Sequence, residues 1–262
     1  MNPLLDLSAR PVIAHRGASA SAPENTLPAF ELAVRQGADA FELDVRLTRD
    51  GAPVVIHDDT LDRTTDRSGL VRSHTLAELR SVDAGARFTS DGGQSYPYRG
   101  GDARIPSLGE VLWAFPRMPV LLEIKEPEAQ EAVRKVLLQE DAAERCVVAS
   151  EHQAALRAFE EAPFARGASG AEIAALYRAS FPGAALLARR PPAVRYRLLS
   201  VPERHRGLTV PTRRFVAAAR ALGCPVHVWT VDRPSAAQRL WRGGVAGIVT
   251  NAPRAIMEAR KD

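Results

Sequence analysis

Short apolar runs alternate with longer amphipathic stretches along almost the whole chain, and this alternation constrains the fold most. Eight runs are continuous and apolar enough for strands of a parallel sheet that is covered on both faces. They are residues 12–15, 40–45, 53–57, 120–125, 145–150, 196–201, 225–231 and 245–250. Eight strands with helical connections over 262 residues predict an α/β fold, a (β/α)8 TIM barrel.

Helix patterns fill most of the intervals between these runs, with prolines and capping residues at their starts and glycines or prolines after their ends. They cover residues 27–36, 107–115, 127–139, 151–161, 212–222 and 234–242, with a shorter helix at 75–80. Asn25 or Thr26 is suited to cap the first helix. We therefore expect one barrel domain over residues 1–262.

Two places break the alternation. Residues 46–52 are too few for a helical crossover and contain the turn signal Asp50–Gly51, so either a hairpin or an irregular connection follows the second strand. Residues 58–106 form a long, polar, glycine-rich insertion after the third predicted strand. Loops of this length inside a compact domain are usually functional.

Composition excludes several classes of protein. The chain is 45% hydrophobic and 25% charged, as in an ordinary globular protein. The apolar stretch at residues 11–14 is too short for a signal peptide or a membrane span, which predicts a cytoplasmic location. Cys146 and Cys224 are too few for a disulfide framework or a thiolate zinc site. The basic residues are interleaved with acids, so we expect no nucleic-acid partner.

Titratable residues stand at the ends of four consecutive predicted strands. Side chains two apart on a strand share a face, and a parallel barrel brings all carboxyl ends of its strands to one rim. These residues are therefore expected to converge at one site. They are His15 and Arg16, Glu42 and Asp44, His57 and Asp58, and Glu123 and Lys125.

Three of these residues are candidate ligands of a metal ion. The apolar neighbours of Glu42 and Asp44 need the helix-covered side of the sheet, which turns both acids toward the barrel mouth. With Glu123 they form a set of three carboxylates without a thiolate, which suits Mg²⁺ or Ca²⁺ rather than zinc. The alternatives are a solvent-facing acidic pair and, for His15, an ordinary hydrogen-bonded histidine.

Eight short motifs follow one another in a characteristic order. They are His15–Arg16–Gly17, Pro23–Glu24–Asn25–Thr26, Phe41–Glu42–Leu43–Asp44–Val45, Val55–Ile56–His57–Asp58, Ile105–Pro106–Ser107–Leu108, Leu122–Glu123–Ile124–Lys125, Val228–Trp229–Thr230–Val231 and Gly247–Ile248–Val249–Thr250. In order and spacing the chain resembles the glycerophosphodiester phosphodiesterase family. The resemblance implies a barrel with a small insertion and metal-dependent hydrolysis of glycerophosphodiesters to an alcohol and sn-glycerol 3-phosphate.

The resemblance also implies a role for each matched residue. The metal ligands correspond to Glu42, Asp44 and Glu123, the acid–base pair to His15 and His57, the residues facing the phosphate to Arg16 and Lys125, and an aromatic wall against the substrate to Trp229. The sequence does not say which histidine is the acid, and we assign His15 as the base and His57 as the acid for the leaving group. Asn25 matches a loop that supports the site, but we favour its role as a helix cap.

The chain departs from the family pattern in three places. Asp232 stands where Asn is usual and Asn251 where Asp is usual, and we expect neither to belong to the core of the site. Glu151 follows Ser150 where the family often has Phe. A further histidine, His227, is expected to be a hydrogen-bonded core residue.

The polar insertion suggests a hydrated substrate. Residues 64–66 and 91–95 suit the headgroup of a small glycerophosphodiester, and the insertion offers few apolar side chains for a lipid surface, so no stable membrane association is expected. Two alternatives stay open. A phospholipase C- or D-like barrel acting on intact phospholipid would need an apolar rim, and a barrel that only binds phosphoesters would have lost a ligand or a histidine.

Overall fold

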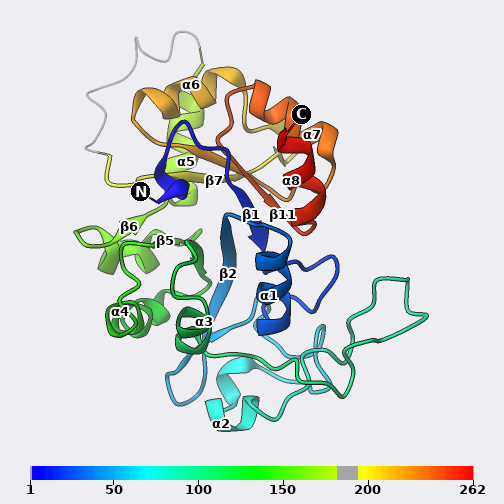
Figure 1. Cartoon of the computed structure of the whole chain (residues 1–262). Coiled ribbons are helices and arrows are strands. Elements are labelled where there is room, and N and C mark those ends of the chain that lie inside the picture. Colours follow the sequence, from blue (N-terminus) through cyan, green and yellow to red (C-terminus); the bar gives the residue numbers. More distant parts are fainter. Residues whose placement is uncertain (1, 182–193, 262) are drawn as a thin grey trace.

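A barrel of eight parallel strands forms the centre of the computed structural model, which describes residues 2–181 and 194–261 (Figure 1). The strands are hydrogen-bonded in the order β6-β5-β4-β2-β1-β11-β10-β7, and a parallel bridge between Gly167 and Leu198 joins the two ends of this row. The prediction of a TIM barrel is confirmed. The barrel strands are β1 (Val12–His15), β2 (Ala40–Leu47), β4 (Val120–Ile124), β5 (Cys146–Ala149), β6 (Ala165–Arg166), β7 (Leu199–Pro202), β10 (Val226–Trp229) and β11 (Gly247–Thr250).

Helices surround the barrel, and several begin at side chains that cap their first turn. Thr26 caps the first helix, while Ser107 and Ser169 form capping boxes with a glutamate three residues later. The helices are α1 (Leu27–Arg35), α2 (Leu76–Leu79), α3 (Leu108–Ala114), α4 (Gln130–Gln139), α5 (Gly170–Ala179), α6 (Arg213–Ala221), α7 (Pro234–Arg242) and α8 (Pro253–Lys261). Short 3₁₀ helices lie at Pro3–Leu5, Val71–Ser73, Pro127–Ala129 and Gln153–Phe159. The sequence did not predict α5 or α8.

One predicted barrel strand is wrong and one is missing. Residues 53–57 were counted among the eight parallel strands, but β3 (Pro53–Val55) pairs antiparallel with the end of β2, which confirms the hairpin alternative. This outcome follows from the short connection, which cannot carry a crossover. The eighth place in the barrel belongs to β6, which has only two residues and therefore gives no apolar run to recognise. The insertion at residues 58–106 thus begins outside the barrel strands.

The floor of the barrel is apolar. Inward-facing residues near the strand starts, including Ile13, Leu121 and Val249, form a buried cluster with Leu4 of the amino-terminal 3₁₀ helix. His227 Nε2 lies 2.9 Å from the Leu4 carbonyl oxygen, and the side chain is fully buried. The expectation that His227 is a core residue is confirmed. No helix in the described part of the chain has the length and apolar character needed to cross a membrane.

His227 should make the fold sensitive to acid. Burial lowers the pKa of this imidazole from 6.5 to about 4, so only the unfolded chain binds a proton between these values. The unfolding free energy should therefore fall by up to about 3 kcal/mol as the pH drops through this window. In His227→Gln the amide can still donate to the Leu4 carbonyl oxygen but does not titrate. The fall in unfolding free energy over this pH window should therefore be smaller than in the wild type by up to about 3 kcal/mol.

Urea denaturation of both proteins at a series of pH values measures the effect. His152→Gln serves as the control, because His152 is exposed. Identical pH dependence in His227→Gln and the wild type would contradict this account.

Candidate active site

A cavity of about 630 Å³ opens at the carboxyl end of the barrel. Seven of the eight predicted site residues line it, and the remaining one, Asp44, is completely buried beneath them. The lining predicted residues are His15, Arg16, Glu42, His57, Glu123, Lys125 and Trp229. His57 differs from the others because it follows β3, which lies outside the barrel, whereas the others lie on a barrel strand or directly after one.

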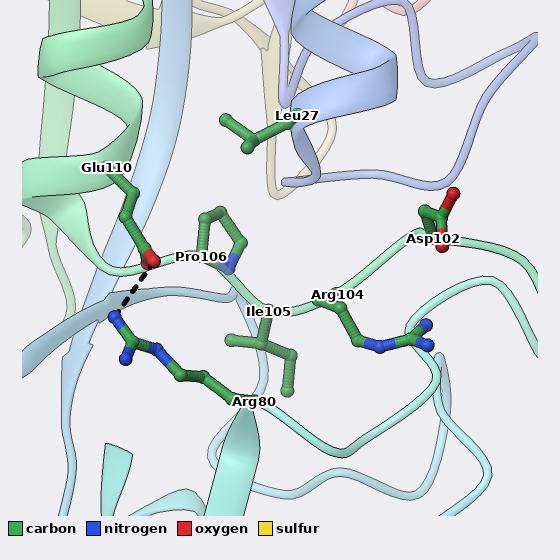
Figure 2. Close-up of a pocket in the computed structure, with 7 residues that line it drawn as sticks. All are labelled: Leu27, Arg80, Asp102, Arg104, Ile105, Pro106 and Glu110. Carbon is green, nitrogen blue, oxygen red and sulfur yellow. Dashed lines mark hydrogen bonds and ion pairs between the residues drawn. The ribbon is translucent and has the colours of Figure 1, made fainter. Parts of the chain in front are cut away.

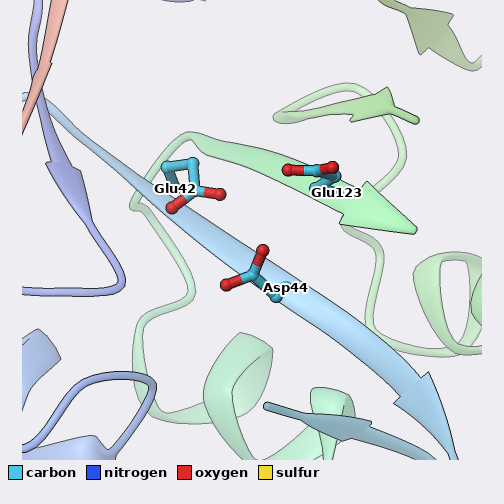
Figure 3. Close-up of side chains that lie close together, drawn as sticks. All are labelled: Glu42, Asp44 and Glu123. Carbon is cyan, nitrogen blue, oxygen red and sulfur yellow. The ribbon is translucent and has the colours of Figure 1, made fainter. Parts of the chain in front are cut away.

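Three carboxylates converge on one point of this cavity. Glu42 and Asp44 project from β2, and Glu123 projects from β4, where it is paired in register with Asp44 (Figure 3). One oxygen from each residue lies within 4.8 Å of the other two. In the described residues this is the only group of three or more acids, histidines or cysteines so arranged. The cluster is therefore suited to a divalent cation with oxygen ligands.

Two cations lie against the same carboxylates. Lys125 Nζ is 2.8 Å from Asp44 Oδ1 and 3.0 Å from Glu123 Oε2. Arg16 Nε is 3.0 Å from Asp44 Oδ2. Both cations also line the cavity, so each can reach a bound anion while it balances the acids.

The pKa directions show that this balance is incomplete. Burial and the charges of Asp44 and Glu123 raise the pKa of Glu42 well above its ordinary value. Burial also raises the pKa of Glu123. For Asp44 burial is outweighed by Lys125 and Arg16, which lower its pKa. Glu42 therefore favours a proton or an additional cation beside it.

An amide holds His15 in place. His15 Nδ1 is 2.7 Å from Asn251 Oδ1, and the Asn251 amide nitrogen donates to Asp232 Oδ2 at 2.9 Å. Because the Asn251 amide nitrogen donates to Asp232, the Asn251 amide oxygen faces His15 and accepts a hydrogen bond from Nδ1–H. The other ring nitrogen, Nε2, then carries a lone pair on the side of Glu42, 3.9 Å away. Asn251 thus contacts a predicted site residue directly, whereas Asp232 reaches His15 only through Asn251, and neither lines the cavity.

A carboxylate holds His57 in place. His57 Nδ1 is 2.6 Å from Asp58 Oδ1, and Arg63 donates to both oxygens of Asp58. Burial raises the pKa of Asp58, but the hydrogen bonds from Arg63 and His57 outweigh it and lower the pKa to about 2. The two histidines therefore have different partners: a neutral amide for His15 and an ionised carboxylate for His57.

The loop before α1 contributes two further residues. Asn25 has a φ of 58° and is buried, and its amide donates to Asp44 Oδ2 at 2.9 Å. The helix cap is Thr26, so the role favoured for Asn25 is wrong. Glu24 accepts from Arg16 at 2.9 Å. The motif that contains both residues was the available signal for this supporting role.

The far wall of the cavity does not come from the insertion. It is built by α5, by the hairpin of β8 (Arg204–His205) and β9 (Leu208–Thr209) with the residue that follows it, and by the end of β10. Its apolar members are Ile173, Ala174, Tyr177, Leu208, Val210 and Trp229. Residues 64–66 and 91–95 do not line it, and the insertion lies far from α5 in Figure 1. The headgroup contacts expected from the insertion are therefore wrong. An apolar rim, which the sequence did not indicate, is present.

A second cavity of about 330 Å³ lies between the start of α1, the end of the insertion and α3 (Figure 2). Its two arginines already have partners. Arg80 pairs with Glu110 at 3.0 Å, and Arg104 donates to the carbonyl oxygens of Gly101 and Ala103. Because its cations are engaged and it holds no histidine, this cavity lacks the chemistry of the first.

Comparison with known proteins agrees with the geometry. The model of the glycerophosphoryl diester phosphodiesterase family matches residues 15–255. A glycerophosphodiester phosphodiesterase from Caldanaerobacter subterraneus subsp. tengcongensis is 34% identical over 256 residues, 94% of this chain and 96% of the relative.

Solved structures give the same result. A phosphodiesterase from Oleispira antarctica, in complex with the product sn-glycerol-3-phosphate, has a TM-score of 0.77 at 30% identity and covers 97% of this chain and 98% of its own. A glycerophosphoryl diester phosphodiesterase domain from Mycobacterium tuberculosis has a TM-score of 0.84 at 24% identity, over 97% of this chain and all of its own, and supports the fold.

Removal of one carboxylate should weaken binding of a divalent cation. The affinity for the cation should fall at least about tenfold in each of the variants Glu42→Gln, Asp44→Asn and Glu123→Gln. Loss of a residue that only hydrogen-bonds to a metal ligand typically costs that much, and these residues would be the ligands themselves. Isothermal titration with Mn²⁺ or Mg²⁺ measures the affinity, and circular dichroism checks the fold. Glu128→Gln, an exposed change three residues after Lys125, is the matched control. Unchanged affinity in all three variants would refute the site.

Proposed function

The chain belongs to the glycerophosphoryl diester phosphodiesterase family, and we propose that it hydrolyses glycerophosphodiesters to an alcohol and sn-glycerol 3-phosphate. The product held by the Oleispira antarctica relative supports this substrate class. The observation that carries the proposal is the meeting of three carboxylates and two differently held histidines at one cavity. Each part of the chemistry can be assigned to residues of this chain.

A divalent cation, Mg²⁺ or Ca²⁺, would be held by Glu42, Asp44 and Glu123. The fit rests on the oxygen-only ligand set and on the raised pKa of Glu42, which marks a local excess of negative charge. When bound, such an ion neutralises charge on the phosphodiester and lowers the pKa of a hydroxyl beside it.

Arg16 and Lys125 would bind the phosphate. Both line the cavity and both are fixed by carboxylates, so they are oriented before substrate arrives. The planar guanidinium of Arg16 can contact two phosphate oxygens, and the ammonium of Lys125 acts as a compact charge. Their attraction grows as negative charge develops on the phosphate in the transition state.

The partners of the two histidines support a division of labour. His15 donates Nδ1–H to an amide, and burial and the Arg16 charge lower its pKa, so Nε2 is free to accept a proton as the base. His57 donates Nδ1–H to an ionised carboxylate, which holds the ring at the cavity, where it can pass a proton to the leaving group. His15 would take the proton of the neighbouring glycerol hydroxyl as it attacks phosphorus, and His57 would protonate the departing alkoxide. Water would then open the cyclic phosphate.

Action on intact phospholipid is the second candidate, because the cavity has the apolar rim that this activity needs. Leu208 is 61% exposed and Trp229 is 37% exposed at this rim. Both predicted histidines and all three acids are present, which disfavours a barrel that only binds phosphoesters. The cytoplasmic location and the absence of stable membrane or nucleic-acid partners stay predictions.

A turnover assay tests the proposal. Glycerophosphocholine, glycerophosphoethanolamine, glycerophosphoglycerol and glycerophosphoinositol are offered with Mg²⁺ and with Ca²⁺, and release of sn-glycerol 3-phosphate is measured. Intact phosphatidylcholine vesicles serve as the second substrate class. We expect activity on glycerophosphodiesters that disappears in excess EDTA. If none of the glycerophosphodiesters is cleaved, the proposed activity is wrong. If turnover persists in excess EDTA, the proposed dependence on a divalent cation is wrong.

The histidine roles should separate by leaving group. His57→Ala should slow glycerophosphocholine, whose alkoxide leaves poorly, by about 100-fold or more, the usual contribution of general acid catalysis. A p-nitrophenyl diester of glycerol 3-phosphate needs little protonation and should be slowed much less. His15→Ala should impair both substrates alike. Steady-state kinetics on both substrates decide the assignment, and equal losses on the two substrates in both variants would refute it.

A further inference from the structure

Arg63 is a charged residue of the insertion that bridges two parts of the site. Its guanidinium donates to Asp58 Oδ2 at 2.5 Å and Oδ1 at 3.2 Å. It also donates to Glu24 Oε2 at 2.8 Å and Oε1 at 2.7 Å. One side chain therefore binds both oxygens of two carboxylates that come from different loops.

Each of these carboxylates holds a residue that lines the cavity. Asp58 is the partner of His57, and Glu24 is the partner of Arg16. Arg16 in turn contacts Asp44 of the acidic cluster. A continuous series of ion pairs thus runs from the leaving-group acid, through Arg63, to the residue that would hold the phosphate.

The contacts are specific for arginine. Without a cation between them, Asp58 and Glu24 would repel each other and separate the insertion from the loop before α1. A lysine would supply the charge, but its single ammonium cannot bind four carboxylate oxygens in one plane as a guanidinium does. The Arg63 side chain is 48% exposed, and ion pairs this exposed add little to stability. The geometry that Arg63 imposes is therefore its main contribution.

We propose that Arg63 is a positioning residue that fixes His57 and Arg16 relative to each other, so that proton donation and phosphate binding occur at the same phosphodiester. Arg63 lies outside the cavity lining and acts only through Asp58 and Glu24. The inference rests on the proposed function, because the two residues it positions receive their roles there.

Arg63→Met should produce two separable defects. Through Asp58 it should lower kcat for glycerophosphocholine roughly tenfold or more while changing kcat for the p-nitrophenyl diester much less. Through Glu24 it should raise KM for both substrates and weaken binding of sn-glycerol 3-phosphate in calorimetry. Asp58→Asn should reproduce only the first defect and Glu24→Gln only the second. A residue with a merely structural role would affect both substrates equally.

Arg67→Met is the matched control. Arg67 lies four residues away, and its side chain is 62% exposed. Among the carboxylates of the described residues it contacts only Asp66, at 3.9 Å. It should behave like the wild type. If Arg63→Met does not fold, Arg63→Lys keeps the charge and should show the same dependence on the leaving group.

The outcomes are distinguishable. An active wild type whose Arg63 variants lose kcat equally on both substrates, with unchanged KM, would overturn this inference and leave the proposed function standing. A wild type inactive on every glycerophosphodiester would overturn the proposed function and this inference with it.

Discussion

The crowding of three carboxylates at the barrel mouth is the constraint on which the rest of the site depends. Glu42, Asp44 and Glu123 are brought together by the parallel register of β2 and β4, which places Asp44 beside Glu123. Buried like charges are costly unless cations accompany them, and Arg16 and Lys125 supply only part of the compensation. The raised pKa of Glu42 reflects the negative charge that these two cations do not balance. The same imbalance that opposes folding of this region favours binding of a divalent cation at the three carboxylates.

The barrel separates this charge from the part that stabilises the fold. A cluster of apolar side chains near the strand starts is closed off by Leu4, and His227, which bonds to Leu4, is kept neutral there by burial because its pKa is lowered to about 4. The strand ends carry the ionisable groups. Because all eight barrel strands run in one direction, a change from apolar to charged residues along β1, β2 and β4 is enough to divide an apolar floor from a charged mouth.

Much of the site could be predicted from the sequence, because the side-chain period of a strand and the geometry of a parallel barrel determine where strand-end residues meet. The predicted number of eight barrel strands is correct only because two errors cancel. The apolar strand β3 was counted although it lies outside the barrel, and β6 was missed because two residues form no pattern. The roles of Asn25 and Arg63 depend on contacts 19 and 39 residues away in the chain, to which no local periodicity points. The apolar wall from α5 and the hairpin escaped prediction for the same reason, since α5 itself was not recognised.

The two departures at Asp232 and Asn251 become one feature in the structure. The Asn251 amide donates to Asp232, so an amide and a carboxylate lie side by side at these two positions. His15 Nδ1 contacts the neutral amide, and the negative charge of Asp232 lies behind it. A carboxylate beside Nδ1 would favour a protonated ring, whereas the amide fixes the tautomer without favouring the charge. The two histidines therefore have unlike partners, a neutral amide for His15 and the carboxylate of Asp58 for His57, and this is the difference that the proposed base and acid would need.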